Sequence, residues 1–243
     1  MTTEEPATSL TASSPGFDAQ ITGIAALAEP IRRALYRYVV AQPGPVNRDQ
    51  AAAGVDVARH VAKFHLDKLV DEGLLDIEFK RLSGRRGPGA GRPSKLYRRA
   101  TREVAVSLPE RRYDLAGQLM AQAIETSRLT GTPVLQALHD AAAAFGASLG
   151  DDLGTAADAA PAGDDGREVT CRVLAAHGYE PRVDGHEITL RNCPFHALVQ
   201  EHTELVCGMN LALVGAVTER LDDRLTPRLN PAEGRCCVVI DSP

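Results

Sequence analysis

Apolar residues recur at helical spacing along the first part of the chain, broken by short polar interruptions. The first such stretch covers residues 21–41. Asn47 then predicts the start of a short helix that ends at Gly54, and Asp56 predicts the start of a longer one that ends near Gly73. Two helices joined by a tight glycine-containing turn are typical of a helix-turn-helix, in which the second helix enters the DNA major groove.

The helix expected after Asp56 has one apolar and one polar side. Its apolar side is formed by Val57, Val61, Phe64, Leu66 and Leu69. The remaining arc carries Arg59, His60, Lys63, Asp67 and Asp71, with the cations toward the N-terminal half and the acids away from it. Arginine can donate two hydrogen bonds to a guanine edge, and His60 or Lys63 can reach bases or phosphates. Asn47 and Arg48, at the start of the preceding helix, are suited to backbone phosphates.

A basic, glycine-rich segment follows this helix directly. Residues 74–82 alternate partly like a strand, SGRRGPGAGRPS excludes regular structure, and residues 95–100 suit a returning strand. A strand, loop and strand in this position predict a wing. Nine Lys or Arg and no acid lie between Lys80 and Arg102, which favours DNA contact over a solvated loop. The wing residues we expect at DNA are Arg85, Arg86, Arg92 and Lys95.

The rest of the chain alternates helical segments with short strands. Helical periodicity covers 103–149, and the small, acidic residues of 150–166 predict a flexible linker. Beyond it we expect a helix at 168–177, two strands around the Asp184-Gly185 turn, helices over 195–222 and a last strand at 236–240. The predicted domains are a disordered tail (1–19), a winged helix-turn-helix (20–102), a helical dimerisation segment (103–149), the linker (150–166) and a C-terminal α+β sensor domain (167–243). The predicted fold class is mainly α with small β elements.

The charge of the chain is unevenly distributed. The formal net charge is −5, yet residues 20–102 carry 16 Lys or Arg against 8 Asp or Glu, whereas residues 103–243 carry 11 against 21. The positive charge is therefore gathered where the helix-turn-helix is expected. The first twenty residues lack the basic start and apolar run of a secretory signal, and no apolar stretch is long enough to span a bilayer. We expect a cytoplasmic protein without a membrane partner.

Three segments of the N-terminal half resemble the ArsR-like winged-helix regulators. They read ALAEPIRRALYRYVVAQ, RDQAAAGVDVARHVAKFHLDKLVDEGLL and GRPSKLYRR. The likeness covers about 20–102. It implies a homodimer that reads a partly palindromic double-stranded DNA operator, with Arg59, His60 and Lys63 on the recognition face.

All five cysteines lie in the C-terminal third, at Cys171, Cys193, Cys207, Cys236 and Cys237. Thirteen residues separate Cys193 from Cys207, and 28 separate Cys207 from Cys236, which excludes paired Cys-x-x-Cys zinc motifs. The spacing is compatible with thiolates from three elements that meet at an iron–sulfur cluster. Adjacent strand residues face opposite ways, so we prefer Cys236 over Cys237 as a ligand. Burial as ordinary core residues is the alternative, and we assign Cys171 to it.

The C-terminal part resembles the iron–sulfur-sensing repressors of the Suf cluster-assembly operon, especially their actinobacterial branch. The likeness lies in the stretch NCPFHALVQEHTELVCGMNLALVGAV and in the later EGRCC. The likeness implies a [4Fe-4S] cluster on Cys193, Cys207 and Cys236, whose loss releases the dimer from DNA. The family's four-cysteine version has a further cysteine where this chain reads TERLDDRLT. A fourth ligand would then be His196, His202, Cys237, an external thiol or water.

Two other functions fit parts of the pattern. The C-terminal domain could bind zinc or sense oxidation by thiol chemistry without any cluster. A thiol enzyme with Cys193 as nucleophile and His196 as base is the third hypothesis, but no orienting group accompanies that pair. The glycines at 84–91 lack the strand-to-helix context of a nucleotide-binding loop. We therefore predict a regulator and not an enzyme.

Overall fold

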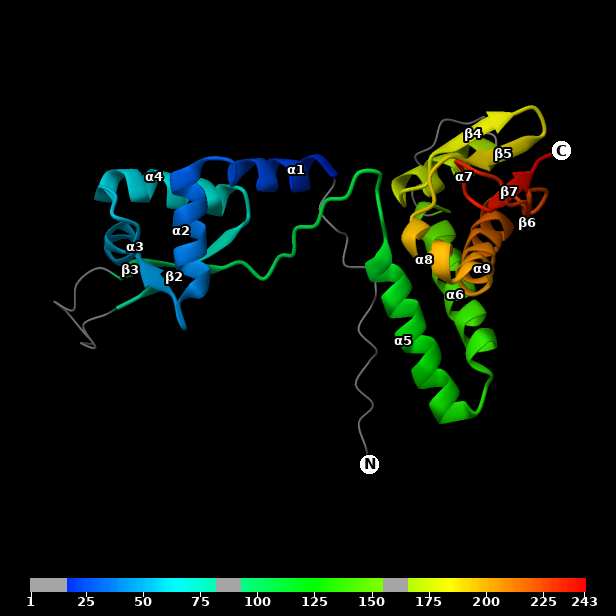
Figure 1. Ribbon diagram of the computed structural model, residues 1–243, viewed down its shortest axis with the longest axis horizontal. Coiled ribbons are helices and arrows are strands. Elements are labelled where there is room, and N and C mark those ends of the chain that lie inside the picture. Colours follow the sequence, from blue (N-terminus) through cyan, green and yellow to red (C-terminus); the bar gives the residue numbers. More distant parts are fainter. Residues whose placement is uncertain (1–16, 82–92, 155–165) are drawn as a thin grey trace. The chain divides into compact units, whose positions relative to one another are not determined.

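The computed structural model describes residues 17–81, 93–154 and 166–243. The chain divides into two units, an N-terminal unit (residues 1–106) and a C-terminal unit (residues 107–243), which are treated separately below (Figure 1). No helix among the described residues is both long and apolar enough to cross a membrane.

The N-terminal unit is a group of helices with a small antiparallel sheet. Its elements are α1 (Phe17–Ala26), α2 (Pro30–Ala41), β1 (Val46–Asn47), α3 (Arg48–Val55), α4 (Arg59–Asp71), β2 (Leu75–Lys80) and β3 (Ser94–Arg99). The sheet order is β1-β3-β2, and Leu75 pairs with Arg99 at one end of the β2–β3 ladder, as Lys80 pairs with Ser94 at the other. The hairpin thus directly follows the two helices α3 and α4, in the position expected for a wing.

Local capping fixes where the helices of this unit begin. Glu29 caps α2, because its carboxylate accepts hydrogen bonds from the backbone N–H groups of Ile31 and Arg32. Asn47 caps α3 as predicted, in a capping box with Gln50 in which both hydrogen bonds are 2.9 Å long. The apolar sides of α2, α4 and β3 then enclose a core that is centred on fully buried Leu35, Leu66, Leu69 and Tyr97.

The turn between α3 and α4 differs from the prediction. Gly54 lies inside α3, and Asp56 ends that helix with a positive φ of 55° instead of starting the next one. A Cβ atom at position 54 would lie 2.0 Å from Cε2 of Tyr38, so this glycine serves close packing and not helix termination. Helix α4 begins at Arg59 after Ala58, which supplies no side-chain cap.

The C-terminal unit combines five helices with a four-stranded antiparallel sheet among the described residues. They are α5 (Tyr113–Thr130), α6 (Val134–Gly154), α7 (Gly166–Ala176), β4 (Pro181–Asp184), β5 (Glu187–Leu190), α8 (His196–Glu201), α9 (Thr203–Leu221), β6 (Thr226–Leu229) and β7 (Val238–Asp241). The strand order is β4-β5-β7-β6. The hairpin at Asp184-Gly185 was predicted, whereas β6 was not. The mainly helical fold class with small sheets is confirmed.

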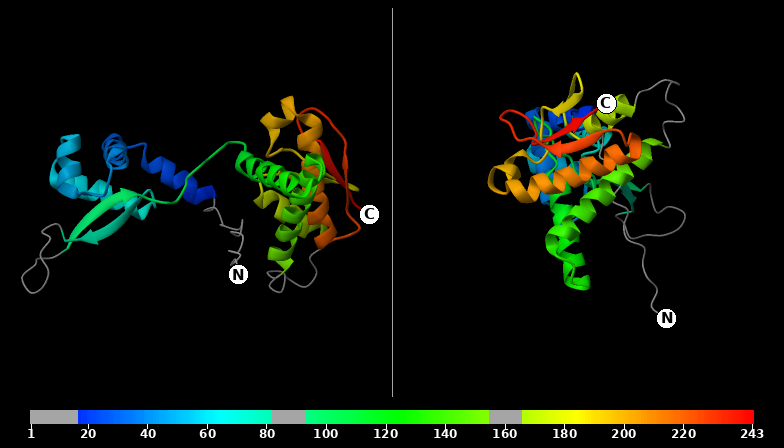
Figure 2. Two further views of the ribbon diagram at one scale, coloured as in Figure 1. Left: turned by 90° about the horizontal axis from the view of Figure 1, so that it is seen from below. Right: turned by 90° about the vertical axis from the view of Figure 1, so that its right-hand side faces the viewer.

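Helices α6 and α9 run side by side through the middle of this unit (Figures 1 and 2). The contact is close at Gly146, where a Cβ atom would lie 2.2 Å from the carbonyl oxygen of Leu213. Fully buried Leu119, Leu138 and Leu213 from α5, α6 and α9 share one apolar core with the sheet. Residues 107–149 and 167–243 therefore form one unit, because neither can bury its apolar face without the other.

This arrangement moves the main boundary from the predicted linker to residues 106 and 107. Helix α6 continues to Gly154, into the stretch that was expected to be a flexible linker. The remaining linker residues, 155–165, lie outside the described part of the chain. The same holds for most of the predicted tail and for the glycine-rich loop at 82–92.

Candidate nucleic-acid interface and cysteine site

Helix α4 presents the predicted cations on its outward side. Arg59, His60 and Lys63 are exposed, while Ala62, Leu66 and Leu69 lie in the core. The helix is held from below by α2 and α3, and the β2–β3 hairpin follows its C-terminal end. Every third or fourth residue faces inward, so the intervening cations share the outer arc.

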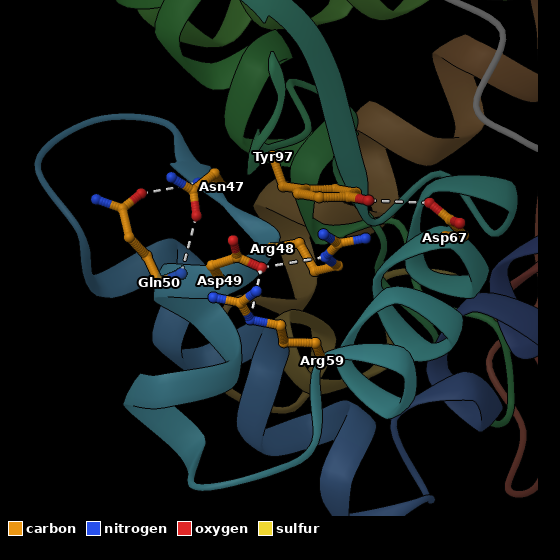
Figure 3. A network of polar contacts seen from close by, with 7 residues as sticks. All are labelled: Asn47, Arg48, Asp49, Gln50, Arg59, Asp67 and Tyr97. Atoms are coloured by element: carbon orange, nitrogen blue, oxygen red, sulfur yellow. Dashed lines mark hydrogen bonds and ion pairs between the residues drawn. The ribbon is translucent and has the colours of Figure 1, made fainter. Parts of the chain in front are cut away.

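One carboxylate joins the starts of α3 and α4. Asp49 Oδ1 lies 3.3 Å from Nε of Arg48 and 3.3 Å from Nε of Arg59 (Figure 3). Arg59 is well exposed and Arg48 is partly exposed, so these ion pairs add little to folding stability. Their effect is positional, because they hold two arginines from different helices beside each other at the turn. Asn47, which was expected to contact phosphate, uses its side-chain oxygen to cap α3.

A second carboxylate links α4 to the hairpin. Asp67 accepts hydrogen bonds from Nζ of Lys63 at 3.0 Å, Nζ of Lys95 at 2.6 Å and the Tyr97 hydroxyl at 3.0 Å. Partial burial opposes ionisation of Asp67, but the bonds from Lys95, Lys63 and Tyr97 outweigh it and lower the pKa of the carboxyl. Asp67 lies in the C-terminal half of α4, yet it contacts Lys63 of the N-terminal half. Position 67 follows Lys63 by one helical turn, which brings the two side chains together.

Phe64 is placed differently from the prediction. It was assigned to the apolar side of the helix, yet 64% of the residue is exposed. The side of α4 that faces the core is formed by Ala62, His65, Leu66 and Leu69. Position 64 lies almost opposite the centre of that side. His65, expected in the core, is buried, with Nδ1 at 3.5 Å from Oε2 of Glu29.

The expected wing contacts are only partly described. Lys95 lies on β3, and its Nζ atom is also 5.1 Å from the centre of the Tyr97 ring. Arg85, Arg86 and Arg92 lie outside the described residues. The described part of the interface is therefore the outer arc of α4, the start of α3 and Lys95.

Four cysteines meet in the C-terminal unit. Cys193 follows β5, Cys207 lies on α9, and Cys236 and Cys237 precede β7. Cys193, Cys207 and Cys236 are buried, whereas Cys237 is partly exposed. The prediction placed Cys236 and Cys237 within the last strand, but β7 begins at Val238. Strand alternation does not govern residues in the preceding bend, so both thiols reach the same site.

The thiols interact in two pairs, Cys193 with Cys236 and Cys207 with Cys237. The Cys236 thiol lowers the pKa of Cys193. The Phe195 backbone N–H and the Arg111 guanidinium lower this pKa further. Cys193, in turn, and then burial raise the pKa of Cys236. Burial, followed by the Cys237 thiol, raises the pKa of Cys207 to about 12. Cys193 is thus the thiol best able to form a thiolate.

Two asparagines that lie within one helical turn of a cysteine in the sequence support this site. Asn210, one turn after Cys207, donates a hydrogen bond from Nδ2 to Sγ of Cys236 at 3.2 Å and accepts one from the buried Tyr179 hydroxyl. Asn192, just before Cys193, donates from Nδ2 to the carbonyl oxygen of Glu110 at 3.0 Å. Sequence reasoning missed both, although a buried amide beside a candidate ligand is a usable signal.

Residues 110–112 fasten the loop that carries Cys193. The Arg111 guanidinium donates to Oδ1 of Asn192 and to the Cys193 carbonyl oxygen, the latter at 3.2 Å. The backbone N–H of Arg112 donates to the Pro194 carbonyl oxygen at 3.0 Å. Residues 110–112 lie at the start of the C-terminal unit, a few residues after its boundary with the N-terminal unit.

The remaining candidates are two histidines and one cysteine. His196 and His202 are exposed at the ends of α8. Cys171 lies on α7, where burial raises the pKa of its thiol. Within the described ranges, no three Cys, His, Asp or Glu side chains are arranged to hold a single metal ion. The side chains gathered here are buried sulfurs, one of which accepts an amide hydrogen bond from Asn210.

Comparison with known proteins identifies the N-terminal unit. Residues 27–78 match a family model described as a helix-turn-helix domain, which covers α2, α3, α4 and most of β2. This supports a DNA-binding regulator of the helix-turn-helix class. No curated protein matches the chain. A structure of human N-acetylserotonin methyltransferase in complex with SAM is 21% identical over 57% of this chain and 43% of that chain, with a TM-score of 0.24. Such a score carries no argument about fold or activity.

Proposed function

We propose that this protein is a transcription regulator that binds operator DNA through α4 and responds to an iron–sulfur cluster on its cysteine site. The observation that carries the DNA-binding part is the helix-turn-helix match, together with the exposed cations on α4. The meeting of thiols from β5, α9 and the bend before β7 supports the sensing part.

The DNA contacts follow from the outer arc of α4. Arg59 and His60 open the helix that enters the major groove, where a guanidinium can pair with the two acceptors of guanine. Arg48, held beside Arg59 by Asp49, is suited to a neighbouring phosphate. Lys63 and Lys95, both bound to Asp67, extend the positive surface from the helix to the hairpin. Arg85, Arg86 and Arg92 would add to the same surface.

Selection of bound sequences from random double-stranded DNA tests this directly. Arg59→Ala should weaken binding to the selected site by roughly 5- to 100-fold and relax the sequence preference at one base pair. The matched control is Arg182→Ala, which removes the same charge from an exposed position on β4, outside the predicted dimerisation segment, and should leave affinity unchanged. Equal losses for the two variants, or no selected sequence, would contradict sequence-specific binding by α4.

A homodimer is part of this proposal, as the likeness to ArsR-like regulators suggests. Two recognition helices of a dimer read half-sites about 34 Å apart, so the selected sequence should be partly palindromic. Sedimentation of the full chain should give the mass of two chains, alone and on DNA. A single chain bound to an asymmetric site would contradict the dimer.

The cysteine site fits a cluster in its chemistry. Cys193, Cys207 and Cys236 would hold it, with Asn210 and the Val238 backbone N–H both donating to the Cys236 sulfur. A four-iron cluster is larger than a single ion, so the two thiol pairs must separate to hold it. When bound, a cluster supplies a centre that oxidation can destroy, and hydrogen bonds to its sulfurs tune that sensitivity. The Cys236 thiol, the Phe195 backbone N–H and the Arg111 guanidinium together lower the pKa of Cys193, which favours the thiolate that ligation requires.

Anaerobic purification with a visible absorption spectrum and iron and sulfide analysis tests the cluster. Cys193→Ser, Cys207→Ser and Cys236→Ser should each reduce iron and colour strongly, whereas Cys171→Ser on α7 should not. Undiminished colour in Cys207→Ser would contradict the ligand set. A wild-type protein without iron after reconstitution would remove the cluster but leave the DNA-binding proposal standing.

The cluster-loaded form is the one we propose to bind DNA, as a repressor of cluster-assembly genes. This direction rests on the likeness to Suf-operon repressors. A gel shift that compares loaded and cluster-free protein tests it. Equal affinity of the two forms for DNA would mean that the cluster does not control DNA binding.

The thiol pairs also favour a second candidate, direct redox sensing without a cluster. The lowered pKa of Cys193 beside the raised pKa of Cys236 is the asymmetry of a reactive and a resolving thiol. Hydrogen peroxide would oxidise Cys193 to a sulfenic acid with release of water, and Cys236 would displace a second water to form the disulfide. Peptide mapping after peroxide treatment of colourless protein should then find the Cys193–Cys236 disulfide. Two free thiols after treatment would exclude it.

A further inference from the structure

Phe64 is an exposed aromatic ring in the middle of a cationic helix surface. It lies one helical turn after His60 and directly after Lys63, on the outer arc of α4. Its exposed fraction of 64% is close to that of Lys63, whose side chain is 60% exposed. The ring contacts its own chain edge-on at His65, with the two centroids 5.2 Å apart. The fold therefore leaves most of this ring without apolar cover.

The charges around Phe64 favour a negatively charged partner as its cover. Arg59, His60 and Lys63 occupy the same arc, and a partner that buries the ring must also accept this positive charge. Duplex DNA is a polyanion, and its major groove offers one apolar group, the 5-methyl of thymine. An apolar protein surface would instead leave the neighbouring cations desolvated and without partners.

We propose that Phe64 packs against the 5-methyl group of a thymine and so determines one base of the operator. This inference rests on the proposed insertion of α4 into the major groove. Phe64 follows Arg59 by five residues, which places it on the second turn of the helix and separates the thymine from the base that Arg59 contacts. Phenylalanine contributes no hydrogen bond, so the discrimination comes from burial of the methyl group alone.

The test replaces each thymine of the selected site with deoxyuridine, one position at a time. Deoxyuridine pairs as thymine does but lacks the methyl group. Burial of one methyl group corresponds to about a fourfold change in affinity. At one position per half-site, wild-type protein should lose about fourfold, and Phe64→Ala should lose nothing further on the same replacement. This non-additivity between protein and DNA identifies the contact.

Phe79→Ala is the matched control, because Phe79 is 63% exposed but lies on β2, outside the recognition helix. It should retain the full methyl dependence of the wild type. Phe64→Leu keeps an apolar side chain at this position and should retain part of that dependence. Circular dichroism shows whether each variant is folded before its affinity is compared.

Three results would overturn the inference. Methyl dependence that is unchanged in Phe64→Ala would mean that another residue reads the thymine. A dimer that dissociates in Phe64→Ala, as measured by sedimentation, would assign the ring to an interface between copies of this chain. Wild-type protein that selects no sequence would remove the proposed function as well, and this result is distinguishable because it is obtained before any deoxyuridine is introduced.

Discussion

The two candidate sites of this protein treat charge in opposite ways. At α4 and the β2–β3 hairpin, Asp49 and Asp67 hold exposed cations in place at the surface. In the cysteine site, three of the four thiols are buried, and Arg111 is the cation that acts on Cys193. An exposed array of cations can meet a polyanion without a change in protonation. Buried thiols must lose protons and separate before they can bind metal.

The two sites also differ in the sequence separation of the residues that form them. Every described residue of the α4 surface comes from positions 47–97, and the capping box of α3 fixes much of its geometry locally. The cysteine site joins Arg111, Cys207 and Cys237 through packing of α9 against α6 and the sheet. The DNA-binding surface should therefore survive damage to the C-terminal core, whereas the cysteine site should not.

The largest expected effect tests this independence. In Gly146→Ala, the new Cβ atom would lie 2.2 Å from the backbone carbonyl oxygen of Leu213, which cannot move without shifting α9. We expect a loss of about 2–3 kcal/mol in the stability of the C-terminal unit. Hydrogen exchange followed by mass spectrometry should show faster exchange in α6 and α9 but not in α4.

Gly117→Ala in α5 is the control for that substitution. Nothing lies within 4 Å of a Cβ atom at position 117, so alanine should stabilise the helix by about 0.5–1 kcal/mol. If Gly146→Ala also accelerated exchange in α4 and α3, the two units would be energetically coupled, and the comparison above would fail.

A smaller effect is expected from the carboxylate that joins α4 to β3. Asp67→Asn keeps the shape of the side chain but removes the charge that binds Lys63 and Lys95. Because these groups are partly exposed and screened by solvent, we expect a loss of about 1–2 kcal/mol in the stability of the N-terminal unit. Hydrogen exchange of α4 and β3 at neutral pH measures it, with exposed Asp71→Asn as the control.

The same carboxylate gives this loss a pH dependence. The folded-state pKa of Asp67 is lowered, so its contribution is fully present above the unfolded value of about 4 and is lost as pH falls through the folded value. The stabilities of wild type and Asp67→Asn should therefore begin to converge below about pH 4 and become equal only below the lowered folded-state pKa. A difference that persisted in acid would mean that the Asp67 charge is not its source.

Local signals predicted the N-terminal unit well. The capping residue Asn47 and the apolar spacing of α2 and α4 are encoded by neighbours in the chain, so helix positions could be inferred from sequence. The errors have tertiary causes. Gly54 resembles a helix-ending glycine until Tyr38 is seen packed against it. Phe64 resembles a core residue until the inward arc is fixed by its neighbours.

The sequence indicated which cysteines form the cysteine site, but not which other residues contact them. Wide cysteine spacing identified which thiols could meet, yet their pairing depends on where β7 begins. The strand-alternation rule does not apply to Cys237 because β7 starts at Val238, two residues after the predicted start at Cys236. Arg111 lies more than eighty positions before Cys193, and no periodicity in the sequence relates the two. Such contacts follow only from the packing of the whole unit.

The smallest expected effect concerns Arg111 itself. In cluster-free protein, Arg111→Ala removes a positive charge that favours the Cys193 thiolate. The pKa of Cys193 should rise toward its usual value, and alkylation by iodoacetamide near neutral pH should slow by a factor of about three. Mass spectrometry of the Cys193 peptide at several pH values measures the shift. Arg112→Ala is the control, since this neighbour binds the Pro194 carbonyl oxygen through its backbone and that contact survives the substitution. Equal slowing in both variants would mean that the charge of Arg111 is not what lowers the pKa of Cys193.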